Sequence, residues 1–165
     1  MVAPLPFRIG TGYDVHPLVL DRPLILGGIE IDFPYGLAGH SDADVLSHAI
    51  ADALLGAAGL GDIGTYFPPS DPQWSGVDSQ IILKKALSEA FRQGYRVGNI
   101  DAVVIAEEPK LAPHIPAMKQ LLAKTLETEP QSIGIKATTH EQLGSLGRRE
   151  GIAAQAVCLL LHNTV

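Results

Sequence analysis

Strand-like and helical segments alternate along this sequence, and that order constrains the fold more than any other feature. Short apolar or alternating runs predict strands, whereas apolar residues spaced three and four apart predict helices. The predicted extended segments are residues 7–18, breaking at Gly10 and Gly12, a hairpin at 23–34 turning on Gly27 and Gly28, and strands at 99–108, 132–138 and 152–162. The predicted helices run from about Ser41 to Ala58, over 79–93 after a cap at Asp78 or Ser79, and over 110–129, opening near Pro113. This order predicts the α+β class.

Length and composition indicate a globular protein. The chain has 165 residues, 46% of them hydrophobic, which is enough to bury a core. It shows no internal repeat, linker or low-complexity segment, so residues 1–165 are predicted to form a single domain. The net charge is −6 and the 12 basic residues form no long run, which argues against a nucleic-acid partner.

The lone cysteine, Cys158, excludes an intrachain disulfide framework and a cysteine-rich zinc module. The first ten residues show neither the pattern of a signal peptide nor that of a transit peptide. No apolar segment approaches the length of a membrane span. We therefore expect a cytoplasmic protein, or a processed form from an organelle, that does not contact membranes.

The helix predicted from Ser41 opens with two histidines and two aspartates, in HSDADVLSHA at 40–49. On a helical wheel, Asp44 and His48 lie together on nearly the opposite side from the apolar residues, so His48 is predicted to avoid the core. One interpretation is a solvent-exposed Asp–His pair. The other comes from GYDVHP, where Asp14 and His16 alternate and so point to one face of an extended segment. With His48 they would form a three-ligand site with an open position, suited to Zn²⁺, with Mn²⁺ or Co²⁺ as substitutes.

Residues 136–151, KATTHEQLGSLGRREG, also allow two interpretations. Two pairs of residues match the capping-box pattern of a helix start: Thr138 with Glu141, and Thr139 with Gln142. Such a start is also an anion site, which Arg148 and Arg149 would complete on a phosphate. Glu141 would suit a Mg²⁺ ion held between phosphates.

The segment EEPKLAPHIP at 107–116 is either an ordinary loop between a strand and a helix or a rigid loop whose backbone groups grip a planar base. The residues alone do not decide between these two hypotheses. Trp74 and His162 are predicted to have no functional role.

Four segments together resemble the 2-C-methyl-D-erythritol 2,4-cyclodiphosphate synthase family of the non-mevalonate isoprenoid pathway. In order, they are RIGTGYDVH, HSDADVLSHAIADALLGAAGLGDIGTYFPPSD, PKLAPHIPAM and KATTHEQLGSLGRREGIA. The similarity is collinear from Arg8 to about Leu161. It implies a four-stranded sheet with helices packed on one face plus a small hairpin, assembling as a homotrimer with active sites between neighbouring subunits.

The resemblance also implies roles for individual residues. The zinc ligands would be Asp14, His16 and His48, and Glu141 would bind a second metal, Mg²⁺ or Mn²⁺. His40 and Thr139 would be the catalytic residues that stabilise the transition state. The implied substrate contacts are Ser41, Asp62, Ile63, Gly64, Phe67, Ser70, Asp71, Ala106, Pro109, Lys110, Leu111, Ala112, Thr138, Ser145 and Arg148. Among these, Asp62 and Gly64 would hold the ribose, and residues 106–112 the cytosine and its phosphate. Asp42 and Asp44 would support the site by capping or by orienting an imidazole.

The implied reaction is an intramolecular phosphoryl transfer. The 2-phosphate of 4-diphosphocytidyl-2-C-methyl-D-erythritol 2-phosphate attacks the β-phosphorus, closing a cyclic diphosphate and expelling CMP. Because both reacting groups belong to one molecule, catalysis needs positioning and charge neutralisation rather than a protein nucleophile. Two cations would serve both needs.

The chain departs from the common family pattern at two positions. His140 stands where a third threonine is usual, and Ser145 where a bulky aromatic often lines the trimer axis. Two other functions are compatible with the metal-ligand residues. A zinc-dependent phosphohydrolase would release inorganic phosphate, and a non-catalytic trimeric scaffold would have a closed four-ligand metal site.

Overall fold

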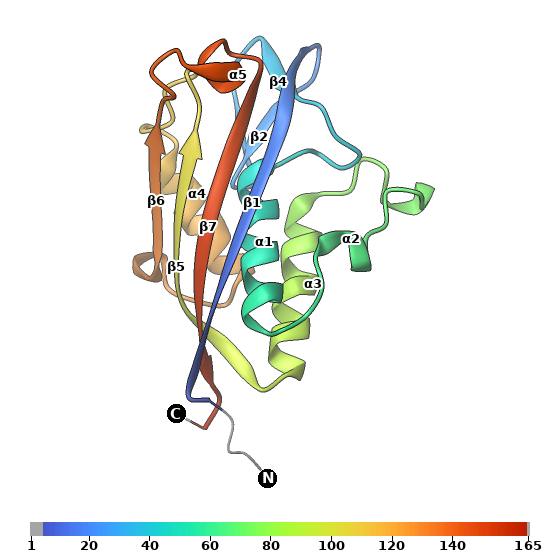
Figure 1. The fold of residues 1–165 in the computed structure, drawn as a ribbon, viewed down its shortest axis with the longest axis vertical. Helices are drawn as coiled ribbons and strands as arrows, with labels where there is room; N and C mark the ends of the chain where they lie inside the picture. Colours follow the sequence, from blue (N-terminus) through green and yellow to red (C-terminus); the bar gives the residue numbers. More distant parts are fainter. Residues whose placement is uncertain (1–4, 165) are drawn as a thin grey trace.

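The main sheet of the molecule has five strands. The computed structural model describes residues 5–164, and Figure 1 shows their arrangement. The strands lie in the order β4–β1–β7–β5–β6, in which β5 and β6 are parallel and the other neighbours are antiparallel. Their bounds are Phe7–Leu20 for β1, Tyr35–Leu37 for β4, Tyr95–Ile105 for β5, Ile133–Thr138 for β6 and Gly151–His162 for β7. With its helices, this sheet gives the mixed α+β fold that the sequence predicts.

The expected sheet of four strands is wrong by one strand. The additional strand, β4, has only three residues and pairs with Leu18–Leu20 at the end of β1. Strands are recognised in sequences from runs of about four to eight residues, so this one is too short to show a pattern. The predicted hairpin is present, because β2 (Leu24–Leu26) and β3 (Ile29–Ile31) pair around Gly27 and Gly28. The φ angles of these glycines, 58° and 76°, are those that a tight two-residue turn requires.

β1 continues through Gly10 and Gly12, where the sequence predicted a break. A Cβ atom on Gly10 would lie 2.1 Å from the carbonyl oxygen of Ala53, and one on Gly12 would lie 2.0 Å from that of Ala49. Both carbonyls belong to the helix packed on this strand. The glycines therefore allow a helix backbone to lie directly against β1, which is a known use of glycine within strands.

The three long helices pack on one side of the main sheet (Figure 1). The bounds are Val45–Ala57 for α1, Ile63–Tyr66 for α2, Ser79–Arg92 for α3, Ile115–Thr125 for α4 and Gly144–Gly147 for α5, with 3-10 helices η1 at Pro72–Trp74 and η2 at Pro130–Ser132. α1 contacts β1 and β7, α3 contacts α1 and β5, and α4 contacts β6. Within residues 5–164, none of the helices is both long enough and apolar enough to span a bilayer.

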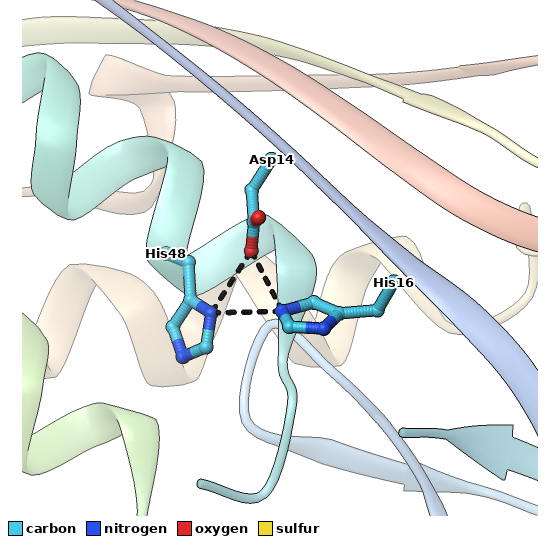
Figure 2. A group of neighbouring side chains, drawn as sticks. All are labelled: Asp14, His16 and His48. Carbon is cyan, nitrogen blue, oxygen red and sulfur yellow. Dashed lines mark hydrogen bonds and ion pairs between the residues drawn. The ribbon is translucent and has the colours of Figure 1, made fainter. Parts of the chain in front are cut away.

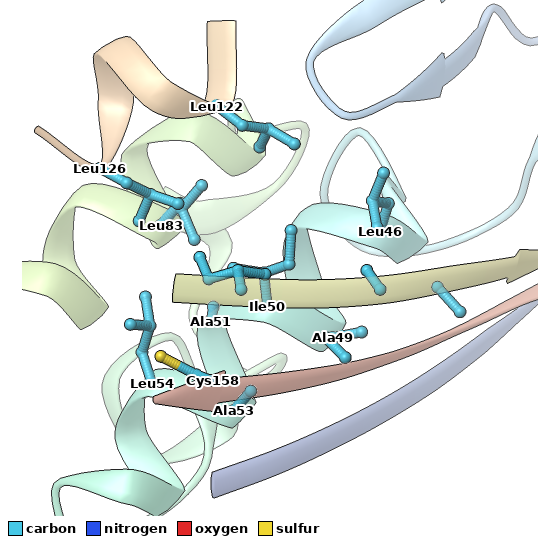
Figure 3. Close-up of a cluster of buried hydrophobic side chains, with 14 of the residues drawn as sticks. Leu46, Ala49, Ile50, Ala51, Ala53, Leu54, Leu83, Leu122, Leu126 and Cys158 are labelled. Carbon is cyan, nitrogen blue, oxygen red and sulfur yellow. The ribbon is translucent and has the colours of Figure 1, made fainter. Parts of the chain in front are cut away.

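The hydrophobic core is centred on α1. Leu46, Ile50 and Leu54 of this helix share one buried cluster with Leu83 of α3 and Leu122 of α4 (Figure 3). Eleven of the 13 residues of α1 are buried, so this helix has almost no face in contact with water. The sheet covers one side of α1 and α3 covers much of the other.

This burial changes the environment of the polar residues on α1. The wheel predicted that His48 avoids the core, and one interpretation exposed it to solvent together with Asp44. In the structure Asp44 is fully buried and His48 is only 5% exposed. The exposed-pair interpretation is wrong because α3 and the β2–β3 hairpin cover the side of α1 that carries both residues.

Within residues 5–164 no helix packs on the other face of the main sheet, where large apolar side chains are exposed beside polar ones such as Thr11 and Gln155. Large outward-facing side chains on β1 and β7 are between 42% and 66% exposed: Phe7, Ile9, Tyr13, Val15 and Val157. A sheet face in contact with water normally carries alternating polar residues. Several large apolar side chains exposed on one sheet face favour a contact surface.

Candidate functional site

Three side chains from β1 and α1 converge on one point (Figure 2). Asp14 and His16 lie two residues apart on β1 and so share its inward face, while His48 comes from the first turn of α1. The Oδ2 atom of Asp14 lies 2.9 Å from Nε2 of His16 and 3.0 Å from Nδ1 of His48. The two nitrogens are 3.4 Å apart. The structure therefore brings the three predicted ligands together as a candidate metal site.

The ring nitrogens that point away from this centre have partners of their own. Nδ1 of His16 donates to the carbonyl oxygen of Ala38 at 2.8 Å. Nε2 of His48 lies 2.8 Å from the hydroxyl of Ser79 and 3.1 Å from that of Ser41. Because a neutral imidazole carries one proton, a proton on each outer nitrogen leaves the inner nitrogens as lone-pair donors. This is the arrangement in which histidine binds a metal.

The electrostatics of the cluster also favour a bound cation. When no metal is bound, the inner nitrogens can instead donate to Asp14; burial raises the pKa of this carboxyl, but hydrogen bonds and charge from His16 and His48 outweigh burial, so the pKa falls from 3.8 to about 2. The hydrogen bond that the Asp14 carboxylate accepts from His16 raises the pKa of His16 above its usual 6.5, although burial opposes this. The carboxylate therefore stays ionised at neutral pH and attracts a positive charge to the centre.

The donor set fits a small divalent cation. The ligands of a tetrahedral Zn²⁺ with bonds of about 2.0–2.1 Å lie roughly 3.3 Å apart. The three donor atoms here are separated by 2.9, 3.0 and 3.4 Å. Among the described residues, no fourth His, Cys, Asp or Glu joins this group. Three ligands with an open position match a catalytic site and give no support to the closed site that a structural scaffold requires.

The two aspartates of the HSDAD stretch take supporting positions. Asp44 caps α1 by accepting hydrogen bonds from the backbone N–H and the hydroxyl of Ser47, at 3.1 and 2.7 Å. It also accepts from the N–H groups of Gly27 and Gly28, at 2.9 and 2.7 Å, and so ties the hairpin turn to the helix. Asp42 accepts from the N–H of Asp44 and binds the first residue of α3. Both aspartates thus hold the segment that carries His48 in place.

The metal-ligand cluster forms one wall of a pocket of about 250 Å³. Five other predicted site residues line it: His40, Ser41, Ile63, Gly64 and Phe67. Trp74, for which the sequence predicted no role, also lines the pocket and packs edge-on against Phe67 with ring centroids 4.7 Å apart. Pro69, Val77 and Ile82 complete the lining and were not identified from the sequence either. The PP-x-D-P-x-W stretch after Phe67 was the only signal that could have pointed to this aromatic wall.

Three further predicted residues lie at the edges of this pocket. Asp62 caps α2 through the N–H of Thr65 at 3.1 Å and lines an adjacent hollow. Asp71 caps η1, and its carbonyl oxygen lies 3.4 Å from Nε2 of His40. Ser70 is exposed beside it. Neither acidic side chain belongs to the metal-ligand cluster.

A second pocket, of about 340 Å³, lies beside the ends of β5 and β6. It is lined by a set of predicted substrate contacts and one predicted catalytic residue: Ala106, Pro109, Lys110, Leu111, Ala112, Thr138 and Thr139. The loop after β5 and the end of β6 therefore form one surface, as the hypothesis of a base-gripping loop requires. Glu141 is exposed just beyond Thr139.

No helix starts at Thr138 or Thr139, so the capping-box interpretation is wrong. Glu141 and Gln142 have φ angles of 51° and 64°, in the left-handed region that a right-handed helix excludes. The hydroxyl of Thr139 instead accepts from the N–H of Glu141 at 3.2 Å, closing a local turn. A carboxylate oxygen of Glu107 accepts from the N–H of His140 at 2.7 Å and holds this loop to the end of β5.

The remaining predicted residues lie on or near α5. Arg148 and Arg149 line a pocket of about 280 Å³ with Glu107, Glu108 and Tyr35. Arg148 pairs with Glu150 at 2.7 Å, and Arg149 pairs with Glu108 at 3.1 Å. Ser145 is exposed on α5. The imidazole of His140 lies 3.3 Å from the carbonyl oxygen of Leu143 and is not part of the metal-ligand cluster.

Within the described part of the chain, the first two pockets are separate. No residue lines both of them. In Figure 1, β6 lies at the left edge of the molecule and α2, which lines the metal-containing pocket, lies at the right. One subunit therefore does not bring Thr139 to His48.

Comparisons with known proteins give a consistent result. A model of the YgbB family matches residues 7–161. A protein of Synechococcus elongatus (strain ATCC 33912 / PCC 7942 / FACHB-805) named 2-C-methyl-D-erythritol 2,4-cyclodiphosphate synthase is 62% identical over 157 residues, which are 95% of this chain and 98% of the relative.

Solved structures show the same similarity. The bifunctional IspDF from Campylobacter jejuni matches with a TM-score of 0.91 and 42% identity over 94% of this chain. This chain spans only 42% of that bifunctional protein. A Plasmodium falciparum IspF in a CDP complex matches with a TM-score of 0.83 and 34% identity, over 94% of this chain and 96% of that one.

Proposed function

The chain belongs to the YgbB family of 2-C-methyl-D-erythritol 2,4-cyclodiphosphate synthases, which act in isoprenoid synthesis, and on that premise we propose a metal-dependent reaction that releases CMP. Residues 1–165 would act as one cyclodiphosphate synthase domain. The substrate would be 4-diphosphocytidyl-2-C-methyl-D-erythritol 2-phosphate. Its 2-phosphate would attack the β-phosphorus, the bond to the CMP phosphate would break, and the product would be the 2,4-cyclodiphosphate.

One observation carries this proposal beyond family membership. It is the cluster of Asp14, His16 and His48, with fixed imidazoles and a strongly acidic carboxyl, in the wall of a pocket that also contains His40 and Ser41. Neither of these last two residues is needed as a nucleophile, because the attacking phosphate belongs to the substrate. The site instead offers what a transfer between two phosphates requires, which is charge neutralisation and orientation.

We assign Zn²⁺ to Asp14, His16 and His48, with Mn²⁺ or Co²⁺ as substitutes, because a carboxylate and two imidazoles suit these ions. A second ion, Mg²⁺ or Mn²⁺, would use Glu141, since these ions prefer oxygen ligands. Bound there, the cations would supply positive charge to the phosphate oxygens. The chain itself would hold the phosphates through His40 and Ser41 and stabilise the transition state through His40 and Thr139.

The nucleotide part of the substrate would occupy the second pocket. Backbone groups of Ala106–Ala112 would grip the cytosine, and Pro109, Lys110 and Leu111 would shape that loop. The P. falciparum relative in a CDP complex supports a cytidine ligand for this family. Asp62 and Gly64 would hold the ribose from the other pocket, with Ile63, Phe67, Ser70 and Asp71 around it. Thr138 and Arg148 would contact phosphate, and Ser145 would lie near them on α5.

A homotrimer would join the two pockets into one active site. The large apolar side chains exposed on the outer face of the sheet support association through β1 and β7, because Ile9 and Tyr13 are more than half exposed in the single chain. The separation of Thr139 from His48 within one subunit supports sites shared between neighbours. We also propose a cytoplasmic location, or an organellar one for a processed form.

The test is incubation of the purified protein with the diphosphocytidyl substrate and Mg²⁺, followed by ³¹P NMR and nucleotide analysis. We expect CMP and the cyclic diphosphate in equal amounts, with no inorganic phosphate. Release of inorganic phosphate without CMP would instead support the zinc-dependent phosphohydrolase and overturn the proposal. Prior removal of metal with a chelator should stop the reaction, and added Zn²⁺ with Mg²⁺ should restore it.

A further inference from the structure

The imidazole of His48 has a second set of contacts on the side away from Asp14. Its Nε2 atom lies 2.8 Å from the hydroxyl oxygen of Ser79, the first residue of α3. The Ser79 side chain is fully buried, so water does not compete for this contact. A residue outside the predicted site thus touches a proposed metal ligand directly.

The hydrogen-bond directions around Ser79 follow from the groups present. The Ser79 hydroxyl donates to a carboxylate oxygen of Asp42, because an ionised carboxylate only accepts. The same carboxylate accepts from the backbone N–H of Ser79 at 2.9 Å and from that of Asp44 at 3.1 Å, which fixes its position. With its proton directed to Asp42, the Ser79 oxygen has lone pairs left to accept from His48 Nε2–H.

Ser41 is a less suitable partner for the same nitrogen. Its hydroxyl oxygen lies 3.1 Å from Nε2 of His48, and it already accepts from the N–H of Ala43 at 3.1 Å. Ser41 also lines the pocket, whereas Ser79 does not. If Ser79 accepts the Nε2 proton, the hydroxyl proton of Ser41 is free to point into the pocket toward a phosphate.

We propose that Ser79, oriented by Asp42, is a positioning residue for His48. It holds the proton of the imidazole on Nε2, so that the lone pair of Nδ1 faces Asp14 and His16. It also fixes the ring plane and, through the carboxylate behind it, strengthens Nδ1 as a donor. In His16, the carbonyl of Ala38 accepts the proton of Nδ1, so that the lone pair of Nε2 faces the centre. This inference rests on the proposed metal site and adds the groups that make His48 a ligand.

A purely structural role for Ser79 predicts different behaviour. The start of α3 is capped by Asp78, whose side chain accepts from the N–H of Gln80 at 2.8 Å. The Asp78 side chain is exposed and lies in neither the metal-ligand cluster nor the metal-containing pocket. Asp78→Ala therefore weakens the same helix end without touching His48, and serves as the matched control for Ser79→Ala.

The test measures the affinity of the purified, metal-free protein for Co²⁺ and Zn²⁺ alone, by competition with a chelator. Ser79→Ala should weaken binding by roughly 10- to 100-fold, as for other groups that orient a metal-ligating histidine. Asp42→Asn should weaken it less, because an amide oxygen still accepts from the Ser79 hydroxyl but carries no charge. Asp78→Ala should bind as the wild type does. Circular dichroism checks that each variant is folded.

A second measurement determines which nitrogen of the His48 imidazole carries the proton. Long-range ¹H–¹⁵N NMR of the Zn²⁺-loaded wild type should show His48 protonated at Nε2, and the Co²⁺ absorption spectrum of Ser79→Ala should differ from that of the wild type. Wild-type affinity in Ser79→Ala, or an equal loss in Asp78→Ala, would overturn the inference while leaving the metal site intact. A wild type that binds neither ion would overturn the metal site itself, and this inference with it.

Discussion

The metal-containing pocket and the second pocket differ in how completely one chain builds them. Asp14, His16 and His48 come from a strand and a buried helix, and each is held by further hydrogen bonds. The loop that carries Thr139 and Glu141 is exposed and is held to β5 mainly through the Glu107 carboxylate. The first pocket is therefore organised before anything binds, whereas the second consists largely of surface loop. We infer that the ligands and the neighbouring subunit complete the second pocket.

Substitution of a metal ligand in the metal-containing pocket should lower activity the most. His48→Ala removes one of three donors, and we expect loss of zinc retention together with a drop in cyclisation on the order of a thousandfold or more. Metal analysis and single-turnover assays would measure both. A variant with full activity would refute the assignment of His48 as a ligand. His162→Ala is the matched histidine control. This residue ends β7 and lines neither pocket.

The loop should respond differently. Glu141→Ala is expected to lower Mg²⁺-dependent turnover by about 10²-fold, because one oxygen ligand to the second ion is lost. Zinc should remain bound at the wild-type level, since Glu141 is not part of the cluster. Metal content and turnover at several Mg²⁺ concentrations test this. Equal loss of both metals would contradict separate sites and remove the contrast between the two pockets.

Stability should show the same contrast. Asp44 is fully buried and accepts from four donors, so Asp44→Ala leaves several buried N–H groups without a partner. We expect the free energy of unfolding of the metal-free protein to fall by about 3 kcal/mol or more. Asp78→Ala, which removes an exposed cap, should cost about 1 kcal/mol. Urea titration measures both, and equal losses would mean that Asp44 does not anchor the hairpin to α1.

The smallest effect concerns pH. In the metal-free protein the pKa of Asp14 is lowered from 3.8 to about 2, so its stabilisation is present above 3.8 and is lost as the pH falls toward 2. The pKa of His16 is raised above 6.5, so its stabilisation is present below 6.5 and is lost as the pH rises through the folded-state pKa. The stability difference between wild type and Asp14→Asn should therefore be largest between about pH 4 and 6.5. Urea unfolding across this range measures it, and a difference independent of pH would contradict the ion pair.

Part of the fold and of the metal-ligand cluster can be predicted from the sequence. Asp14 and His16 could be placed on one face from their spacing alone, and the long helices from their periodicity. Gly10 and Gly12 were misinterpreted, because a glycine that ends a strand and one that admits a helix backbone look the same in a sequence. Ser79 could not be connected to His48, since their contact depends on how α3 crosses α1.

The loops that line the pockets were harder to predict from the sequence. Both capping-box matches, at Thr138 and Thr139, predicted a helix start. The left-handed conformation of Glu141 prevents a helix from forming there. The three-residue strand β4 was too short to recognise, and Trp74 joined the pocket only through the path of the loop after α2. The residue types were thus sufficient to predict a metal site. The pocket walls that loops form could be identified only from the three-dimensional structure.

We propose that the two pockets are halves of one active site contributed by neighbouring subunits. Complementation tests this arrangement: His48→Ala and Glu141→Ala chains, each impaired alone, are mixed in equal amounts during refolding. In a random trimer about a quarter of the shared sites would combine an intact metal-ligand cluster with an intact loop. We predict cyclisation restored to about that fraction of the wild-type rate. Activity no higher than that of the separate variants would contradict sites shared between subunits.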